Sequence, residues 1–427
     1  QLYESGVVKN IYTLAADVLP TEALPQYVRQ LQTGGLLSLA TMRLIATTAT
    51  ADYALLYLKQ GPVTLGYHAL ERMLQVAEET GAAMVYADHY SVEAGKTVKH
   101  PVTAYQLGSI RDDFDFGSVV LLKTECLKEY AAREVAKDYQ FAGWYDLRLF
   151  LSRKGELFHL NEYLYTEEED DLRASGEKQF DYVNPRNREV QIEMEQAATA
   201  HLSAIKALVD TTQYVQPDFS GETFPVEASV VIPVFNREKT VRDAVISALS
   251  QKTDFPFNVI VVDNHSTDGT TEILSSLAAD ERLVHLIPTR TDLCIGGCWN
   301  YAINDAHCGR FAVQLDSDDL YSSENTLQAI VNAFHEQKAA MIVGSYRMCD
   351  FDLNTLPPGL ISHNEWTEDN GCNNALRING LGAPRAFFTP LVRQHQFPNT
   401  SYGEDYAMGL AFSRRFRIGR IYDELYL

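Results

Sequence analysis

The sequence predicts an α/β protein made of two similar halves, each built around a mostly parallel sheet. From about residue 227 onward, short runs of β-branched residues alternate with amphipathic segments of helical length, which is typical of parallel strands joined by crossover helices. Weak matches in one order relate the first half to the second, with a period of roughly 250 residues. A chain of 427 residues also exceeds one ordinary hydrophobic core, so we expect two domains.

The second half opens with a strand over residues 229–234, whose Val and Ile side chains indicate burial on both faces. A helix with apolar residues at helical spacing follows, and Asn236 is expected to cap it. Further strands are predicted at residues 258–262, 283–287 and 311–315, with a helix at residues 299–307.

Acidic side chains follow two of these strands. Asp263 ends the second strand, and Asp316-Ser317-Asp318-Asp319 ends the fourth. Carboxylates separated by one residue point the same way from an extended backbone, as ligands of Mg²⁺ or Mn²⁺ carrying a diphosphate would. Asp319 has a second interpretation as a cap of the next helix, with Ser322 and Ser323 as rival caps. Because ligands bind beyond the carboxyl ends of parallel strands, we expect these groups to share one crevice.

The first half is predicted to be a degenerate copy of the second. Its first predicted strand, residues 7–14, corresponds to the second strand of the other half. Where the second half has its acidic run, the first reads Leu58-Lys59-Gln60-Gly61, which cannot hold a divalent cation in the same manner. We therefore interpret the first half as non-catalytic. The matched segments are 50–57 with 308–315, 82–85 with 339–342, 116–118 with 381–383, 143–147 with 402–406, and 160–164 with 422–426.

The predicted organisation is a degenerate domain over residues 1–182, a helical linker over 183–226 and a catalytic domain over 227–427. The linker prediction rests on apolar residues at helical spacing between residues 185 and 210. The acidic run at residues 167–171 is expected to be a solvated loop.

Composition excludes some classes of partner and cofactor. A formal charge of −21 without a Lys/Arg-rich stripe argues against binding of nucleic acid. The sequence has no run of about 18 apolar residues, so it predicts no membrane-spanning helix. Six cysteines without framework spacing favour a reducing, cytoplasmic setting, with peripheral attachment at the inner face of a membrane as the alternative. A zinc site at Cys294, Cys298, His307 and Cys308 is a weaker alternative to ordinary helix packing.

Four motifs make the second half resemble the family 2 glycosyltransferases of GT-A fold. They are Val231–Asn236, Val261–Thr270, Leu315–Asp319 and Gly403–Asp405, in the order that the family shows. The resemblance covers residues from about 228 to the end, and makes the first half a degenerate GT-A-like copy. It implies an inverting, metal-dependent transfer of sugar from a UDP- or GDP-sugar to a saccharide or glycoconjugate hydroxyl, in polysaccharide or glycan biosynthesis.

The resemblance also implies roles for individual residues. Asp405, beside Glu404, is the expected base that takes the proton of the acceptor hydroxyl. Asp318 is expected to contact Mn²⁺ or Mg²⁺, and Asp316 the metal or the donor ribose.

The nucleotide is expected at the ends of the first two strands of this half. The carboxylate of Asp263 can accept a hydrogen bond from a uracil or guanine N–H. The alternative is a purely structural role, as a helix N-cap or in a turn. Pro233, Phe235 and Asn236 would form the wall beside the base.

Substrate contacts are also predicted around residues 366–384, because members of the family bind the donor sugar and the acceptor in the corresponding region. Trp366 is either a stacking platform for a sugar or part of the core. Asn300 is a second candidate for contact with the substrate. It ends the segment 291–300, in which this sequence departs from the pattern of the family.

Two other functions compete with glycosyl transfer. A sugar nucleotidyltransferase uses a related sheet and cation, but the sequence lacks the Gly-rich, Lys/Arg-bearing loop that such enzymes place near the first strand. A non-catalytic carbohydrate- or nucleotide-binding scaffold would not need both the metal carboxylates and the base.

Overall fold

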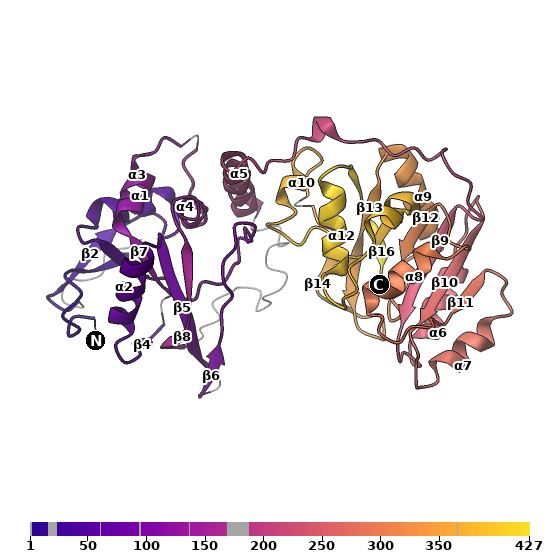
Figure 1. Ribbon diagram of the computed structural model, residues 1–427, viewed down its shortest axis with the longest axis horizontal. Helices are drawn as coiled ribbons and strands as arrows, with labels where there is room; N and C mark the ends of the chain where they lie inside the picture. The colour runs from indigo at the N-terminus through magenta and orange to yellow at the C-terminus, as the bar shows by residue number, and fades with distance from the viewer. Residues whose placement is uncertain are drawn as a thin grey trace. The chain divides into compact units, whose positions relative to one another are not determined.

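The computed structural model describes residues 2–15, 24–59, 61–93, 95–135, 137–168, 188–364 and 366–427. The chain divides into two compact units (Figure 1). The first comprises Gln1–Leu208 with Leu376–Ile378, and the second comprises Val209–Ala375 with Asn379–Leu427. Within the described part of the chain, no helix is long and apolar enough to cross a membrane.

The second unit contains an eight-stranded sheet in the order β11-β10-β9-β12-β15-β13-β14, with β16 paired to β13. Strands β9 to β12 run parallel where they pair, whereas β15 is antiparallel to both of its neighbours. The strands are β9 (Ala228–Val234), β10 (Phe257–Asp263), β11 (Leu283–Leu286), β12 (Phe311–Gln314), β13 (Met341–Cys349), β14 (Thr355–Ile361), β15 (Arg385–Phe388) and β16 (Ile418–Tyr426).

Helices cover both faces of this sheet, as alternation along β9 requires. Val230 and Ile232 face a cluster built with α6, α7 and α9, and Val231 faces a cluster built with α8, α11 and α12. The helices are α6 (Val241–Leu249), α7 (Thr270–Leu277), α8 (Ile295–Asn304), α9 (Thr326–Gln337), α10 (Gly371–Asn374), α11 (Thr389–His395) and α12 (Glu404–Ser413), and a short 3₁₀ helix, η4, spans Thr211–Gln213.

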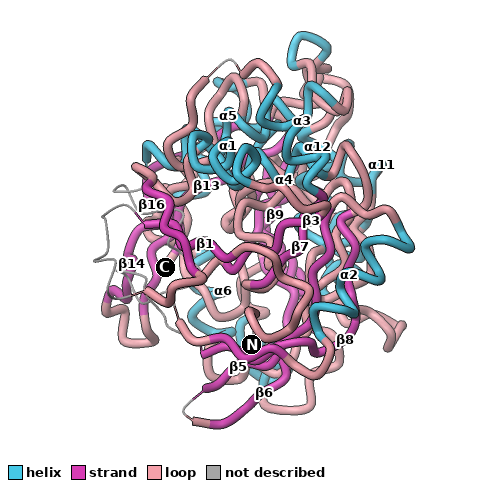
Figure 2. Tube along the Cα trace, turned by 90° about the vertical axis from the view of Figure 1, so that its left-hand side faces the viewer, coloured by secondary structure: helices cyan, strands magenta, loops and turns pink. Residues whose placement is uncertain are grey.

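The first unit has a six-stranded sheet in the order β3-β7-β5-β8-β4, with β6 paired to β5, and a separate parallel pair, β1 and β2. Figure 2 shows the strands in magenta and the helices in cyan. The strands are β1 (Ile11–Ala15), β2 (Val28–Gln32), β3 (Tyr53–Tyr57), β4 (Val63–Leu65), β5 (Met84–Glu93), β6 (Lys96–His100), β7 (Val119–Lys123) and β8 (Leu157–Glu168). The helices are α1 (Leu39–Thr48), α2 (Ala69–Thr80), α3 (Thr124–Ala132), α4 (Gly143–Leu151) and α5 (Arg188–Ala204).

Helix α5 is the amphipathic segment expected between the halves. It packs on α4, and its Ala197, Ala198 and Leu202 belong to a core cluster of the first unit. Its apolar stripe is therefore buried within one unit.

The two units repeat one arrangement of strands. Strand β7 is antiparallel to β3 and β5, and β5 is parallel to β8, just as β15 is antiparallel to β12 and β13, and β13 is parallel to β16. The register repeats as well: Leu122 pairs with Ala54 and Met84, as Phe387 pairs with Ala312 and Met341. The weak sequence matches thus correspond to equivalent positions in two sheets.

The first unit differs from the second at the position that corresponds to strand β9. Among the described residues, no strand of the first unit lies between the β1–β2 pair and β3, whereas β9 joins β10 to β12 in the second unit. Pairs in the six-stranded sheet are consequently mostly antiparallel, with β5 and β8 as its parallel pair.

The last sequence match is one residue out of register. Both sheets have two irregularities in the final parallel pair, after which His89 pairs with Tyr165 and Tyr346 with Tyr426. Tyr165 therefore takes the place of Tyr426, where the sequence match assigns Leu164. A shift of one residue moves a side chain to the other face of a strand, so only the correct register places the two phenols alike.

A buried polar cluster follows β3, at the position of the acidic run in the second unit. Glu167 is only 2% exposed, and it accepts hydrogen bonds from Lys59 and Ser118. His89 Nε2 lies 3.2 Å from the same carboxylate. The expected solvated loop at residues 167–171 is thus wrong for the buried Glu167. Glu168 is exposed as expected but belongs to β8 like Glu167, and the rest of the run lies outside the described residues.

Replacing Glu167 with Gln tests the charge of this cluster. Burial alone would raise the pKa of Glu167, but its three partners outweigh burial and lower the pKa to about 2. Because this pKa lies below that of the unfolded chain, the carboxylate stabilises the fold above about pH 4.5 and loses this effect as the pH falls towards 2. Glu167→Gln should cost about 2–3 kcal/mol of unfolding free energy at pH 7, measured by urea denaturation. A cost that does not shrink at pH 3 would assign the effect to packing.

Candidate functional site

The parallel strands β9, β10 and β12 bring three loops to one edge of the second sheet. Strand β9 lies between the other two, so the loops after Val234, Asp263 and Gln314 are neighbours. This is the crevice position expected from the sequence.

Asp263 holds the turn after β10. Its side chain has no exposed surface, and it accepts hydrogen bonds from Ser266 N–H at 3.0 Å and from the Thr271 hydroxyl at 2.6 Å. His285 Nε2 lies 3.4 Å away. Burial opposes ionisation, but these hydrogen bonds outweigh it and leave the pKa of Asp263 below its ordinary value. The carboxylate therefore fixes the loop, and its contact with a nucleobase stays a prediction.

Asn236 connects the loop after β9 to the loop after β10. Its backbone is left-handed (φ +53°), its N–H donates to Ser266 Oγ, and its Oδ1 accepts from Thr267 N–H at 2.7 Å. The predicted capping role is wrong, because α6 begins later, after Thr240, and has no side-chain cap.

The other two residues predicted to line the nucleotide site differ in exposure. Pro233 is partly buried within β9, opposite Val262 of β10, whereas Phe235 follows the strand and is 54% exposed. Phe235 is thus the predicted wall residue with a ring surface open to a ligand.

Asp316 and Asp318 lie in different surroundings. Both Asp316 oxygens accept from the Gln314 amide, at 2.9 and 3.0 Å, and its N–H donates to the Tyr426 hydroxyl at 3.2 Å. Asp318 is 42% exposed in its side chain, and its Oδ2 lies 3.4 Å from Arg237 Nε. One carboxylate is held in place, and the other projects towards solvent.

The third carboxylate of the run is held close to the first two. Burial, with Asp316 and Asp318 nearby, raises the pKa of Asp319 to about 7. It does not cap α9, which begins at Thr326 after Asn325, so that interpretation is wrong.

The donor set fits a hard divalent cation in part. Burial raises the pKa of Asp316, and Asp318 and Asp405 add to this effect. Carboxylates that repel one another in this way favour a bound cation. Within the described ranges, however, no group of three or more Asp, Glu, His or Cys side chains is arranged to hold a metal. Mg²⁺ and Mn²⁺ that bind nucleotides commonly take only one or two protein carboxylates, beside phosphate oxygens and water.

Arg385 links the acidic run to the predicted base. It begins β15, and since Ala386 pairs with Val313, it comes opposite Gln314. Arg385 Nη1 donates to Gln314 Oε1 at 2.8 Å, and Nη2 donates to Asp405 Oδ2. Its Nε donates to the Leu381 carbonyl at 2.6 Å, so a guanidinium only 11% exposed spans three segments.

Glu404 and Asp405 form the first turn of α12, after Gly403 with φ +78°. Asp405 is 31% exposed, but Glu404 is 7% exposed, and its Oε2 has no hydrogen-bond partner among the residues that the structure describes. Burial raises the pKa of Glu404, and the charge of Asp405 raises it further. The exposed member of the pair is thus the one that resemblance assigns as base.

Helix α8 starts earlier than the sequence predicts, at Ile295, and two glycines in its first turn let it lie close to the loop before α12. A Cβ at Gly296 would overlap the carbonyl oxygen of Pro398 and lie 3.1 Å from Glu404 Cβ. A Cβ at Gly297 would overlap the side chain of Asn399. The contact fixes the position of Glu404 and hence the start of α12.

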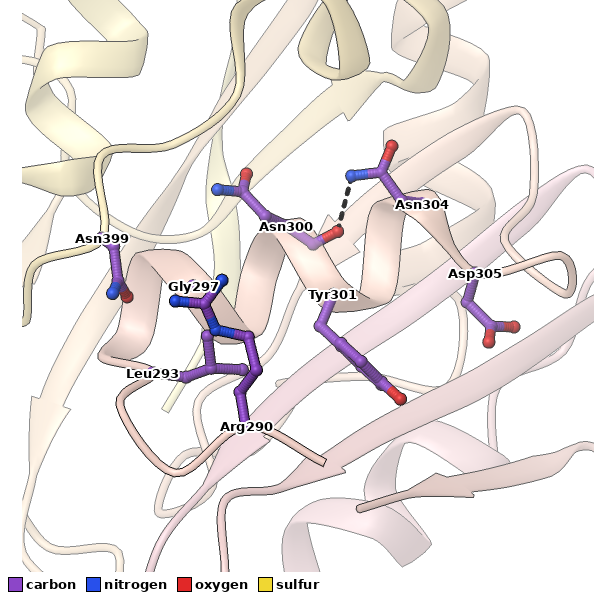
Figure 3. A pocket seen from close by; sticks show the side chains of 8 residues that line it. All are labelled: Arg290, Leu293, Gly297, Asn300, Tyr301, Asn304, Asp305 and Asn399. Atoms are coloured by element: carbon purple, nitrogen blue, oxygen red, sulfur yellow. Dashed lines mark hydrogen bonds between the residues drawn. The ribbon is translucent and has the colours of Figure 1, made fainter. Parts of the chain in front are cut away.

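Asn300 lies on α8 beside a cavity of about 540 Å³ (Figure 3). Its amide is already bonded to the backbone of Phe397: Nδ2 donates to the carbonyl at 2.8 Å and Oδ1 accepts from the N–H at 2.7 Å. Asn300 thus shapes the cavity wall, and its predicted substrate contact stays a prediction. The cavity is lined by Arg290, Leu293, Gly297, Asn300, Tyr301, Asn304, Asp305 and Asn399.

Trp366 belongs to the core and not to the crevice surface. It is 4% exposed, and the guanidinium carbon of Arg420 lies 4.3 Å from a ring centroid of its indole. A side chain at Gly371 would overlap the same indole. A ring packed in this way offers no face to a sugar, so the stacking interpretation does not fit this placement.

The cysteines of the zinc alternative are packed as apolar groups. Cys298 and Cys308 lie in the cluster beneath α8, and burial raises the pKa of both thiols to about 11. A zinc ligand is a thiolate, which this environment disfavours.

Three residues of the site escaped sequence reasoning: Gln314, Arg385 and Tyr426. The signal for Gln314 was available, since it is the polar residue within the apolar run 311–315. Nothing in the spacing marks Arg385 or Tyr426, which reach Asp316 only through pairing in the sheet.

Residues 229–390 match the family described as Glycosyl transferase family 2. An uncharacterized glycosyltransferase of Haemophilus influenzae is 27% identical over 128 residues, 30% of this chain and 50% of its own length. The O-antigen chain rhamnosyltransferase WbaN of Salmonella anatum is 25% identical over 33% of this chain and 43% of its own. The putative teichuronic acid biosynthesis glycosyltransferase TuaG of Bacillus subtilis is 26% identical over 44% of this chain and 72% of its own.

Among solved structures, S. aureus TarS 1-349 in complex with UDP-GlcNAc is 24% identical, with a TM-score of 0.39 over 47% of this chain and 57% of that chain. The chain spans half or less of the length of the first three curated relatives that it matches.

Replacing Gly296 with Ala tests the contact between α8 and the loop before α12. The new methyl group meets backbone that cannot move alone, so unfolding free energy should fall by about 1–3 kcal/mol, seen as a lower Tm. Gly269→Ala is the matched control, because its Cβ would meet the flexible side chain of Glu238 and no backbone, with Oε2 at 3.2 Å and Cβ at 3.7 Å. Equal Tm values for the two variants would contradict the close approach.

Proposed function

Because residues 229–390 form a family 2 glycosyltransferase domain, we propose that the chain transfers a sugar from a nucleotide diphosphate sugar to a hydroxyl of a saccharide or glycoconjugate, with inversion at the anomeric carbon. The observation that carries this proposal is the bridge from Asp405 through Arg385 to Gln314 and Asp316. It holds a base candidate and a metal carboxylate at one edge of the sheet. The names of two relatives, a rhamnosyltransferase of O-antigen and a putative teichuronic acid glycosyltransferase, support polysaccharide biosynthesis.

In the proposed reaction, Asp405 accepts the proton of the acceptor hydroxyl while that oxygen forms a bond to the anomeric carbon. The bond from this carbon to the diphosphate oxygen breaks, and the nucleoside diphosphate leaves from the opposite face. The hydrogen bond from Arg385 orients one Asp405 oxygen, and the partial exposure of Asp405 leaves it accessible to an acceptor.

Asp316 and Asp318 are the proposed protein ligands of Mn²⁺ or Mg²⁺. A bound cation supplies Lewis-acid stabilisation of charge on the departing diphosphate. The hydrogen bonds from Gln314 hold Asp316 towards this position, and the exposed Asp318 is free to turn to it. Phe235 and Asn236 would line the end of the crevice that takes the base of UDP or GDP, and the buried Asp263 would hold the loop beside it.

We propose that the first unit is not catalytic. The position of its lost acidic run carries Lys59, whose ammonium pairs with Glu167. This ion pair places an ammonium group at the position where the run of the second unit carries the carboxylates of Asp316, Asp318 and Asp319. The six free cysteines support a reducing compartment, and we propose the cytoplasm, at or near the inner face of a membrane.

Asp318→Ala should lower the rate of sugar transfer by at least about 100-fold, because a metal ligand at the diphosphate is removed. The rate of the slow background hydrolysis of the donor should fall by the same factor. The measurement is release of free nucleotide from a panel of UDP- and GDP-sugars with Mn²⁺. Asp243→Ala, an exposed carboxylate in the first turn of α6, is the control and should retain wild-type rates. Undiminished release by Asp318→Ala would overturn the metal site.

Asp405→Asn separates catalysis from donor binding. The amide keeps an acceptor for Arg385 but cannot take a proton, so transfer should fall by about 10²–10⁴-fold. The Kd of UDP or GDP in the presence of Mn²⁺ should change less than about twofold, since the base does not touch the nucleotide in this proposal. Transfer at the wild-type rate would exclude Asp405 as the base.

A further inference from the structure

Arg237 lies in the loop after β9, facing the acidic run. Its Nε is 3.4 Å from Asp318 Oδ2, and the two side chains are 48% and 42% exposed. A pair this exposed is weak, because solvent and salt screen its attraction. Arg237 and Asp318 can therefore exchange partners at little cost.

The backbone beneath Arg237 is, in contrast, firmly fixed. Its N–H donates to Thr270 Oγ1 at 2.8 Å, and the next N–H, of Glu238, donates to Asp268 Oδ2 at 3.1 Å. On the other side, Asn236 is bonded to the same neighbouring loop through Ser266 and Thr267. The guanidinium, whose Nη1 donates an exposed hydrogen bond to the Asn236 carbonyl at 3.3 Å, extends from this fixed backbone at the rim of the crevice.

The negative charge of the crevice favours an additional cationic side chain near a bound diphosphate. Five carboxylates, Asp316, Asp318, Asp319, Glu404 and Asp405, interact electrostatically at this edge. Arg385 is committed to Asp405, Gln314 and the Leu381 carbonyl, and it is nearly buried. A diphosphate that enters with one divalent cation still meets net negative charge. An exposed arginine fork is the protein group best suited to phosphate oxygens.

We propose that Arg237 is a diphosphate-binding residue that Asp318 holds in the absence of a cation. When a divalent cation takes Asp318, the guanidinium is released and donates to the phosphate oxygens of the donor. This inference rests on the proposed function, because it assumes that the crevice takes a metal and a nucleoside diphosphate.

Such an exchange has two consequences of opposite sign. Arg237 competes with the cation for Asp318 when no nucleotide is present, so its loss should strengthen binding of Mn²⁺ alone. With a diphosphate present, Arg237 is a favourable contact, so its loss should weaken binding of the diphosphate. A purely structural arginine would weaken both.

The test compares the full-length wild type with Arg237→Gln and Arg237→Lys. Mn²⁺ alone is titrated by electron paramagnetic resonance, and UDP, GDP and inorganic pyrophosphate are titrated by calorimetry with Mn²⁺ held at saturation. Arg237→Gln should bind Mn²⁺ alone about 2–5-fold more tightly and the diphosphates at least about 10-fold more weakly. Arg237→Lys should fall between, since a lysine keeps the charge but loses the fork.

Arg242→Gln is the matched control, because Arg242 is an exposed arginine of the next helix, α6, and donates to Ser276 Oγ of α7 at 3.1 Å. It should leave all the Kd values unchanged. Diphosphate affinity in Arg237→Gln equal to that of wild type would overturn the inference while leaving the proposed function intact. A wild type that binds Mn²⁺ but none of the three diphosphates would overturn both.

Discussion

The arrangement of the candidate site depends on one countercharge, the guanidinium of Arg385. Five carboxylates gather at the carboxyl edge of the second sheet, and bringing like charges together in a partly buried place is unfavourable unless a cation offsets them. Arg385 contacts Asp405 directly and reaches Asp316 through Gln314. Because it is nearly buried, solvent screens these contacts less than it screens the exposed pair of Arg237 and Asp318.

The position of Arg385 follows from the sheet itself. Strand β15 runs antiparallel to β12, so its first residue lies opposite the last residue of β12, which is Gln314. The loop before α12 is fixed separately, by the close approach of Gly296 to Pro398. A strand pair and a helix contact thus place side chains that have no proximity in the chain.

The same framework carries different chemistry in the two units. Both have one order and register of strands from β3 to β8 and from β12 to β16, including the irregularities that place Tyr165 and Tyr426 alike. In the second unit, the Tyr426 hydroxyl supports Asp316. In the first, the Tyr165 hydroxyl accepts from Ser118 N–H beside the pair of Lys59 and Glu167. Backbone pairing is preserved because it needs only apolar residues with the right alternation, whereas the polar ends of strands are free to diverge.

The sequence alone predicts the α/β class, the repeat, strands β9 to β12 and the location of Asp263, Asp316 and Asp318 at strand ends, because these follow from local patterns of apolar residues and their periods. It did not determine that Asn236 bonds across to a neighbouring loop, that Trp366 is covered by Arg420, or that Glu167 lies buried in a strand. Only the tertiary structure decided these, along with the bridge through Gln314 and Arg385. The physical reason is that each depends on which side chains meet across strands and loops distant in the chain, and local spacing carries no record of such meetings.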